Sequence, residues 1–116
     1  MADEKELVWV GNAKKKIQAF PPEVKSVFGV ALYWAQKGGK HPQAKPLKGF
    51  TGAGVVEIVE DFDSDTYRCV YTVRFGHKVY VLHAFQKKAK KGISTPKPDI
   101  DLIKERIKEV KRREGM

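Results

Sequence analysis

The chain has 116 residues, 41% of them hydrophobic and 32% charged, which is enough for one domain with a modest core and too little for a separate catalytic module. No apolar run approaches the roughly 20 residues of a membrane-spanning helix, and the acidic, polar start of the chain does not look like a secretion signal. We therefore expect one soluble domain, residues 1–116, in the cytoplasm and not in a membrane.

The net charge of +9 is unevenly distributed along the chain. Residues 57–65 contain five acidic side chains and no basic one, whereas the segments on either side are basic. A basic domain favours a polyanionic partner, because cations that neutralise phosphates release bound counterions. The same charge is equally compatible with ordinary solvated lysine faces.

The first half of the chain predicts one short strand and two helices. Residues 7–10 are β-prone and are followed by Gly11, after which residues 13–19 can form a helix with its lysines outward. A second helix is expected to begin at Pro22 and to stop at Gly38, because its apolar residues recur with the period of one buried helical face. Residues 40–54 are rich in proline and glycine and predict a long loop, with at most a short ordered piece at 47–50.

The second half predicts a three-stranded meander and a last helix. Strands are expected at residues 55–59, 67–74 and 78–85, with an acidic turn at 61–66 and a hairpin connection at 75–77. Asp99 is a candidate N-cap for a helix whose residues Ile100, Ile103, Ile107 and Val110 point inward. The fold class is thus α+β, a small antiparallel sheet of an N-terminal strand plus the meander, with helices covering one side.

Several short motifs follow one another in a specific order. They are Lys45-Pro46-Leu47-Lys48-Gly49, Tyr67-Arg68-Cys69-Val70-Tyr71, Leu82-His83-Ala84-Phe85-Gln86-Lys87-Lys88 and Thr95-Pro96. Together they resemble the RelE/HigB toxin superfamily, and within it the phage-derived HigB-like branch. The resemblance covers roughly residues 7–110 with the same order of elements.

This resemblance implies a RelE-like fold and a toxin of a type II toxin–antitoxin system. It further implies a metal-independent endoribonuclease without a cofactor, which cleaves mRNA, often on the ribosome. The implied protein partner is a small helix-turn-helix antitoxin that covers the active face.

The basic residues of the motifs are the first candidates for the site. Arg68 matches the arginine of the Y-R-x-x-Y motif, and its planar guanidinium can hold a scissile phosphate; an exposed strand arginine or an ion pair with the acidic turn is the alternative. Lys87 and Lys88 match the closing lysine pair, and one of them is expected to face the phosphate if the strand register allows it. Lys45 and Lys48 are expected to hold the RNA backbone. For each lysine, a solvated surface position is the alternative.

His83 lies in a matching motif and is a candidate general base or acid, because histidine titrates near neutral pH. Its position among apolar strand residues favours a packed, hydrogen-bonded side chain instead. Phe85 can either pack in the core or stack on a base. Tyr67 and Tyr71 alternate to the face opposite Arg68 and are predicted to be core.

Cysteine and histidine spacing predicts no metal site. Cys69 is the sole cysteine, and its apolar strand predicts a buried thiol in a reducing compartment. Trp34 could contribute to base stacking if it is exposed.

The first strand of the meander departs from the family pattern, because many relatives have a basic residue there, whereas the charged residues of this chain in the stretch 55–61 are all acidic. A carboxylate beside a bound phosphate repels it by about 1 kcal/mol per exposed pair, and by more when both are desolvated. Glu57 is therefore either a general base or a group that weakens cleavage. The second possibility leaves open a catalytically weak module that binds an antitoxin or RNA.

Overall fold

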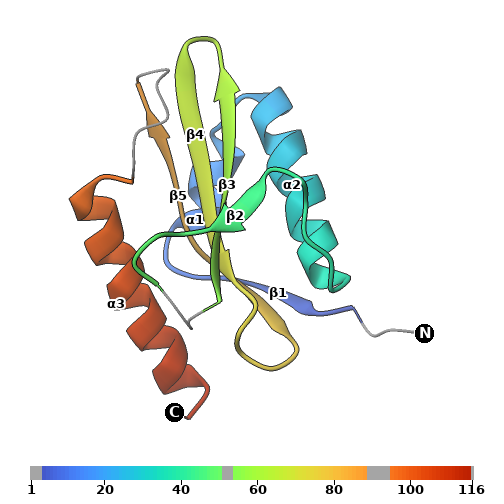
Figure 1. Cartoon of the computed structure of the whole chain (residues 1–116), viewed down its shortest axis with the longest axis vertical. Helices are drawn as coiled ribbons and strands as arrows, with labels where there is room; N and C mark the ends of the chain where they lie inside the picture. The colour runs from blue at the N-terminus through green and yellow to red at the C-terminus, as the bar shows by residue number, and fades with distance from the viewer. Residues whose placement is uncertain (1–3, 51–53, 89–94, 116) are drawn as a thin grey trace.

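The structure is a computed structural model that describes residues 4–50, 54–88 and 95–115. Figure 1 shows a central sheet with helix α2 on one side and helix α3 on the other. The elements in chain order are β1 Glu6–Trp9, α1 Ala13–Gln18, α2 Pro22–Gln36, β2 Ala44–Pro46, β3 Val55–Phe62, β4 Asp65–Thr72, β5 Lys78–Lys87 and α3 Lys97–Arg113. The predicted α+β class is confirmed. In the described parts of the chain, no helix has the length and apolar character needed to cross a membrane.

The five strands are ordered β1-β5-β4-β3-β2. β3, β4 and β5 form the predicted antiparallel meander. β1 differs from the expectation, because it pairs parallel to β5 and makes the sheet mixed. Helices α1 and α2 carry the chain across the sheet from β1 at one edge to β2 at the other, so β1 can join β5 without a hairpin.

β2 lies within the predicted loop of residues 40–54, so the loop prediction was wrong at Ala44–Pro46. This short strand pairs antiparallel with β3 and places Lys45 opposite Glu57. Proline is tolerated in an edge strand, because its missing N–H can face away from the ladder. The proline- and glycine-rich composition of the segment therefore did not indicate this strand, which is stabilised by its pairing with β3.

The turn between β3 and β4 is tighter than the acidic turn predicted for residues 61–66. Phe62 pairs with Asp65, so the connection is only Asp63 and Ser64, which have φ of +50° and +70°. Two consecutive positive φ values suit a two-residue hairpin that follows the twist of the strands. Asp61 and Asp65 therefore belong to the strands, and Asp63 is the one acidic residue in the turn.

One face of the sheet packs against α1 and α2. α2 has Pro22 in its first turn and buries the side of the helix that contains Phe28 and Leu32. Tyr67 and Tyr71 join this apolar cluster, which confirms their predicted place in the core. Cys69 also lies there, and burial raises the pKa of its thiol to about 12.

The other face packs against α3, so the helices cover both sides of the sheet and not one. Ile103, Ile107 and Val110 of α3 are buried against Val70 and Leu82. The helix begins at Lys97, with Pro96 as its N-cap. The prediction of Asp99 as the N-cap was wrong, because Pro98 fits the first turn, where an N–H has no partner within the helix.

A β-bulge in β5 sets the orientation of the predicted site motif. Val70 pairs with His83 and Tyr71 pairs with Val81, so Leu82 is an extra residue between the two pairs. The bulge lets both Leu82 and His83 lie on the α3 side. The alternation that follows puts Phe85 and Lys87 on that side as well.

Candidate active site

The strand register collects most of the predicted site residues on the α3 side of the sheet. Glu57 pairs with Val70, which pairs with His83, and in the next row Val59 pairs with Arg68, which pairs with Phe85. Lys45 adjoins the first row from β2, and Lys87 ends the following row opposite Thr66. The side chains that share this face are Lys45, Glu57, Arg68, His83, Phe85 and Lys87. Motifs far apart in the sequence therefore meet at one surface.

Glu57 and Arg68 form a buried ion pair at the centre of this face. Arg68 Nη1 donates to Glu57 Oε2 at 2.9 Å, and the two residues are only 3% and 5% exposed, respectively. Lys45 Nζ lies 3.8 Å from Glu57 Oε1, and the Thr95 hydroxyl donates to Oε2 at 3.4 Å. Arg68 is therefore not an exposed strand arginine, and its partner in this ion pair lies on β3 and not in the acidic turn. The acidic side chain of Glu57 does face the site.

This arrangement places a proton acceptor between two cations. The Glu57 carboxylate is held in one orientation by Arg68, while its second oxygen faces the more exposed Lys45. Fixed cations can stabilise a developing negative charge, and a carboxylate beside them can accept a proton. The cluster therefore contains two of the kinds of group that phosphodiester cleavage needs, a base and cations that stabilise negative charge.

The two lysines at the end of β5 have different positions. Lys87 is half-buried in the last strand position, on the same face as Arg68 and two residues beyond Phe85, which pairs with Arg68. Lys88 follows the end of the strand and is exposed. Of the pair, Lys87 is the lysine that the register directs toward Arg68.

His83 is packed and hydrogen-bonded, as its apolar neighbours in the sequence suggested. Its Nε2 lies 2.7 Å from Asp99 Oδ1, and its ring stacks on Phe85 with centroids 5.1 Å apart. Burial lowers the pKa of His83, an effect that Asp99 opposes and the nearby Arg106 reinforces. Arg106 Nη1 also donates to the Leu82 carbonyl at 2.7 Å. His83 thus ties the start of α3 to β5.

Asp99 and Arg106 were not predicted as partners of the site motif. Both flank the apolar stripe of α3, where a helical wheel can indicate a side chain that reaches the sheet. The wheel does not show which strand residue each one meets. That information comes only from the way the helix packs on the sheet.

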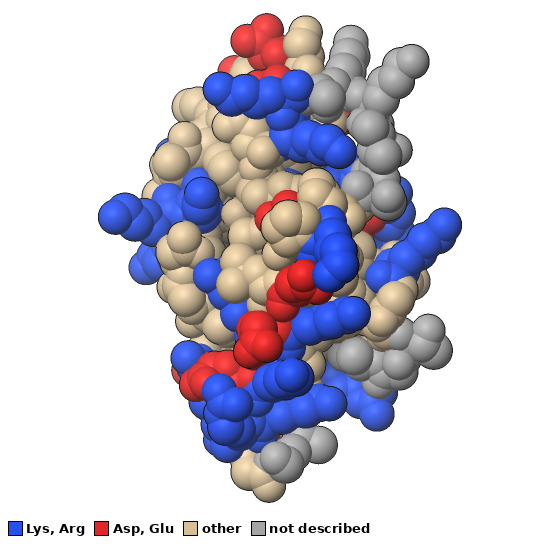
Figure 2. All heavy atoms as spheres, turned by 90° about the vertical axis from the view of Figure 1, so that its left-hand side faces the viewer, with Lys and Arg blue, Asp and Glu red and all other residues tan. Residues whose placement is uncertain are grey.

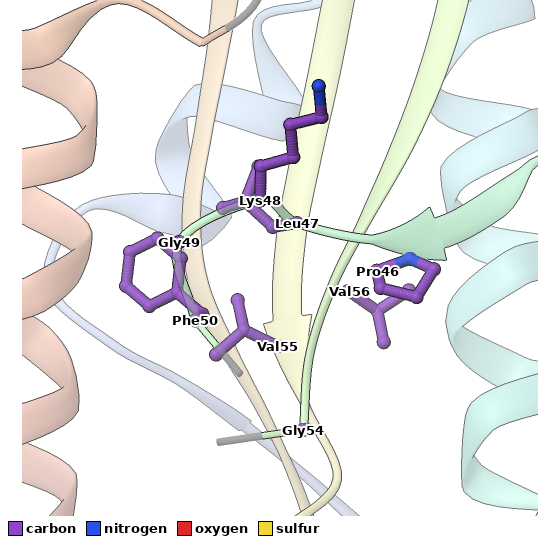
Figure 3. A pocket seen from close by; sticks show the side chains of 8 residues that line it. All are labelled: Pro46, Leu47, Lys48, Gly49, Phe50, Gly54, Val55 and Val56. Atoms are coloured by element: carbon purple, nitrogen blue, oxygen red, sulfur yellow. The ribbon is translucent and has the colours of Figure 1, made fainter. Parts of the chain in front are cut away.

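Lys48 lies outside the cluster, on the segment after β2. Residues 46–50 and 54–56 line a cavity of about 520 Å³ whose side chains are apolar except for Lys48. Figure 3 shows the Lys48 side chain extending away from Phe50 and Val55. The ammonium group is therefore available at the surface, and Lys48 is the one ionisable residue among those that line the cavity.

Trp34, the candidate for base stacking, does not belong to this face. Trp34 is 42% exposed, but it lies on α2, across the sheet from Arg68. No set of three or more histidine, cysteine or acidic residues that could hold a metal ion occurs in the part of the chain that the structure describes.

The family of phage-derived Gp49-like proteins matches residues 15–108. The chain belongs to this family. Gp49-like proteins are related to RelE toxins, so the predicted membership of the RelE/HigB superfamily, in its phage-derived branch, is confirmed. The match spans the β2 segment, the meander and most of α3, and thus every predicted site residue.

No curated protein matches this Gp49-like chain. Among solved structures, the chain is similar to the RelBE2 toxin–antitoxin complex from Mycobacterium tuberculosis, with 15% identity and a TM-score of 0.48. The similarity covers 76% of this chain and 97% of the other chain. The family assignment rests on the Gp49-like sequence match.

Proposed function

We propose that this Gp49-like protein is the toxin of a type II toxin–antitoxin system and acts as an mRNA endoribonuclease. The observation that carries the proposal is the cluster of Glu57, Arg68, Lys45 and Lys87 on one face of the sheet. The family membership supports the toxin class. The partner proposed from the superfamily resemblance is a helix-turn-helix antitoxin, and the substrate is mRNA, with the ribosome as the site of cleavage.

The proposed reaction uses side chains alone. Glu57 accepts the proton of the 2′-hydroxyl, and the 2′-oxygen attacks the adjacent phosphorus. The bond from phosphorus to the 5′-oxygen breaks, leaving a 2′,3′-cyclic phosphate and a 5′-hydroxyl. Arg68 and Lys87 stabilise the charge on the phosphoryl oxygens, and Lys87 supplies the proton for the leaving oxygen.

The remaining residues have supporting roles in this proposal. Lys45, the exposed member of the cluster, and Lys48, which is exposed on the segment after β2, hold the RNA backbone. His83 is a positioning residue that anchors α3 through Asp99, since burial lowers its pKa and disfavours the protonated form. Phe85 stacks on His83 and supports that anchor.

The test is tightly controlled induction in bacteria, with growth and new mRNA 5′ ends as readouts. The wild type should arrest growth and cleave messages. Lys87→Gln should lower the cleavage rate of the purified protein by about 100-fold, a typical loss for one group that stabilises a transition state. Lys88→Gln is the matched control, because it removes the same charge one residue away, and Lys25→Gln on α2 controls for net charge.

Normal growth and intact messages with the wild type would refute the ribonuclease. Equal loss in Lys87→Gln and Lys88→Gln would leave the nuclease in place but reject the assignment of Lys87. Circular dichroism of each variant separates loss of activity from loss of fold.

A second candidate function is a binding module with little cleavage. It is favoured by the 2.9 Å contact between Glu57 and Arg68, because the carboxylate occupies the guanidinium that a phosphate needs. Glu57→Gln distinguishes the two functions. If Glu57 is the general base, the variant loses cleavage; if Glu57 only blocks Arg68, the variant binds RNA more tightly than the wild type.

A further inference from the structure

Helix α3 presents two different flanks beside its buried face. Ile103, Ile107 and Val110 face the sheet. On one flank, Arg106 donates to the Leu82 carbonyl and to Asn12 Oδ1, which fixes that flank against β5 and the start of α1. Successive helical residues are rotated by about 100°. The rotation puts the lysine flank, defined as Lys97, Lys104, Lys108 and Lys111, on the opposite side of α3, toward β2.

The segment from β2 to Phe50 lies next to this lysine flank. Leu47 and Phe50 belong to the same apolar cluster as Ile103 and Ile107, so the segment packs beside the helix. Lys48 is exposed on that segment. Figure 2 shows that side of the molecule, with a band of acidic side chains and many Lys and Arg side chains around it.

The cations of the lysine flank are available for a ligand. Lys97 pairs with Asp101 at 2.9 Å and Lys108 with Glu105 at 3.9 Å, but these are exposed contacts within one helix. Such pairs are weak and exchange readily with another anion. Within the described residues, Lys104 and Lys111 take part in no ion pair.

We propose that the lysine flank, Lys48 and Lys45 form a track for the backbone of single-stranded RNA that leads to the Glu57–Arg68 cluster. The proposal rests on the ribonuclease function proposed above, and it names a surface outside the reacting groups. Lys104, Lys108 and Lys111 lie within about 10 Å along the helix axis, which suits successive phosphates. Lys45 connects the track to the cluster through its contact with Glu57.

An RNA backbone fits this surface better than an acidic protein does. Protein interfaces have an apolar centre in which charged residues are depleted. The exposed apolar residue of α3, Leu102, lies on the Arg106 flank and not among the lysines. A surface of point charges without apolar contacts is typical of phosphate binding.

The experiment measures binding of the wild-type chain to a fluorescent single-stranded RNA by anisotropy, from 50 to 300 mM salt. The RNA carries 2′-O-methyl groups, so the wild type cannot cleave it. Lys104→Gln/Lys111→Gln should weaken binding by about 10-fold near 100 mM salt and reduce the slope of log K against log salt by about 1.4. The control, Lys15→Gln/Lys25→Gln, removes two exposed charges outside α3 and the β2 segment and should leave the slope unchanged.

The outcomes separate the track from the nuclease. Equal losses in the two double variants, or unchanged binding by Lys104→Gln/Lys111→Gln, would overturn the track, and unchanged binding would point to an acidic protein on this flank. Both results would leave cleavage by the Glu57–Arg68 cluster intact. Failure of the wild type to bind RNA even at 50 mM salt would overturn the track, whereas the proposed function stands or falls separately on growth arrest and new mRNA 5′ ends after induction. Thermal melts should agree among the variants, because glutamine and lysine have similar helix propensities.

Discussion

Removing either partner of the Glu57–Arg68 ion pair should destabilise the protein strongly. The two side chains are 7% and 4% exposed, so a charge that loses its partner stays in a poorly solvated place. Breaking a buried ion pair in this way typically costs about 3–5 kcal/mol. The perturbations are Glu57→Gln, Arg68→Gln and the double variant.

The surroundings of each residue indicate how much free energy of unfolding each variant should lose within that range. In Arg68→Gln, Glu57 keeps Lys45 at 3.8 Å and the Thr95 hydroxyl at 3.4 Å, so we expect a loss near the lower limit, about 3 kcal/mol. In Glu57→Gln, the guanidinium loses its carboxylate, and we expect about 4 kcal/mol. The double variant leaves no unpaired charge and should lose about 2 kcal/mol less than the sum of the singles.

Urea unfolding of the four proteins at pH 7.5 measures these differences as a double-mutant cycle. For a chain of this size, a loss of 3 kcal/mol corresponds to a fall in Tm of roughly 12 °C. Glu60→Gln is the control, because Glu60 lies on the same strand, points to the other face and accepts a hydrogen bond from the exposed Gln43. It should cost less than about 1 kcal/mol.

The reasoning would be refuted by single losses of less than about 1 kcal/mol, or by losses that add within about 0.5 kcal/mol. Either result would mean that water or other groups solvate the pair. The Glu57 carboxylate would then be free to move away from Arg68 when a phosphate binds, which would remove the structural reason for the binding-module alternative.

Two further predictions follow from the buried titratable groups. The pKa of His83 is lowered below 6.5 in the fold, mainly by burial, so the unfolded chain binds more protons and stability should fall as the pH drops below about 6.5. Urea midpoints at pH 7.5 and 5.5 should therefore differ more for the wild type than for His83→Gln, and equal differences would contradict the assignment. Burial raises the pKa of Cys69 to about 12, so iodoacetamide should not label it at pH 8 until urea unfolds the protein. Labelling of the native protein at the unfolded rate would show that the thiol is accessible.

Arg68, Lys87 and His83 could be singled out from the sequence because each lies in a short motif of a known family. The residues that contact them in the fold could not be predicted from the sequence. Glu57 was recognised as an acidic residue in an unusual place, but its contact with Arg68 depends on the pairing of two strands. The lysine flank of α3 is visible on a helical wheel, yet its position beside Lys48 follows from the packing of the helix on the sheet.

The sequence by itself determined the α+β class, the buried faces of α2 and α3, the core positions of Tyr67 and Tyr71, and the family. These features follow from local periodicity and from motifs within a few residues of one another. Only the tertiary structure decided the parallel pairing of β1, the edge strand β2, the bulge at Leu82 and the burial of Arg68 against Glu57. Each of these depends on contacts between distant segments, whose free energy comes from burial and pairing and leaves no local pattern in the chain.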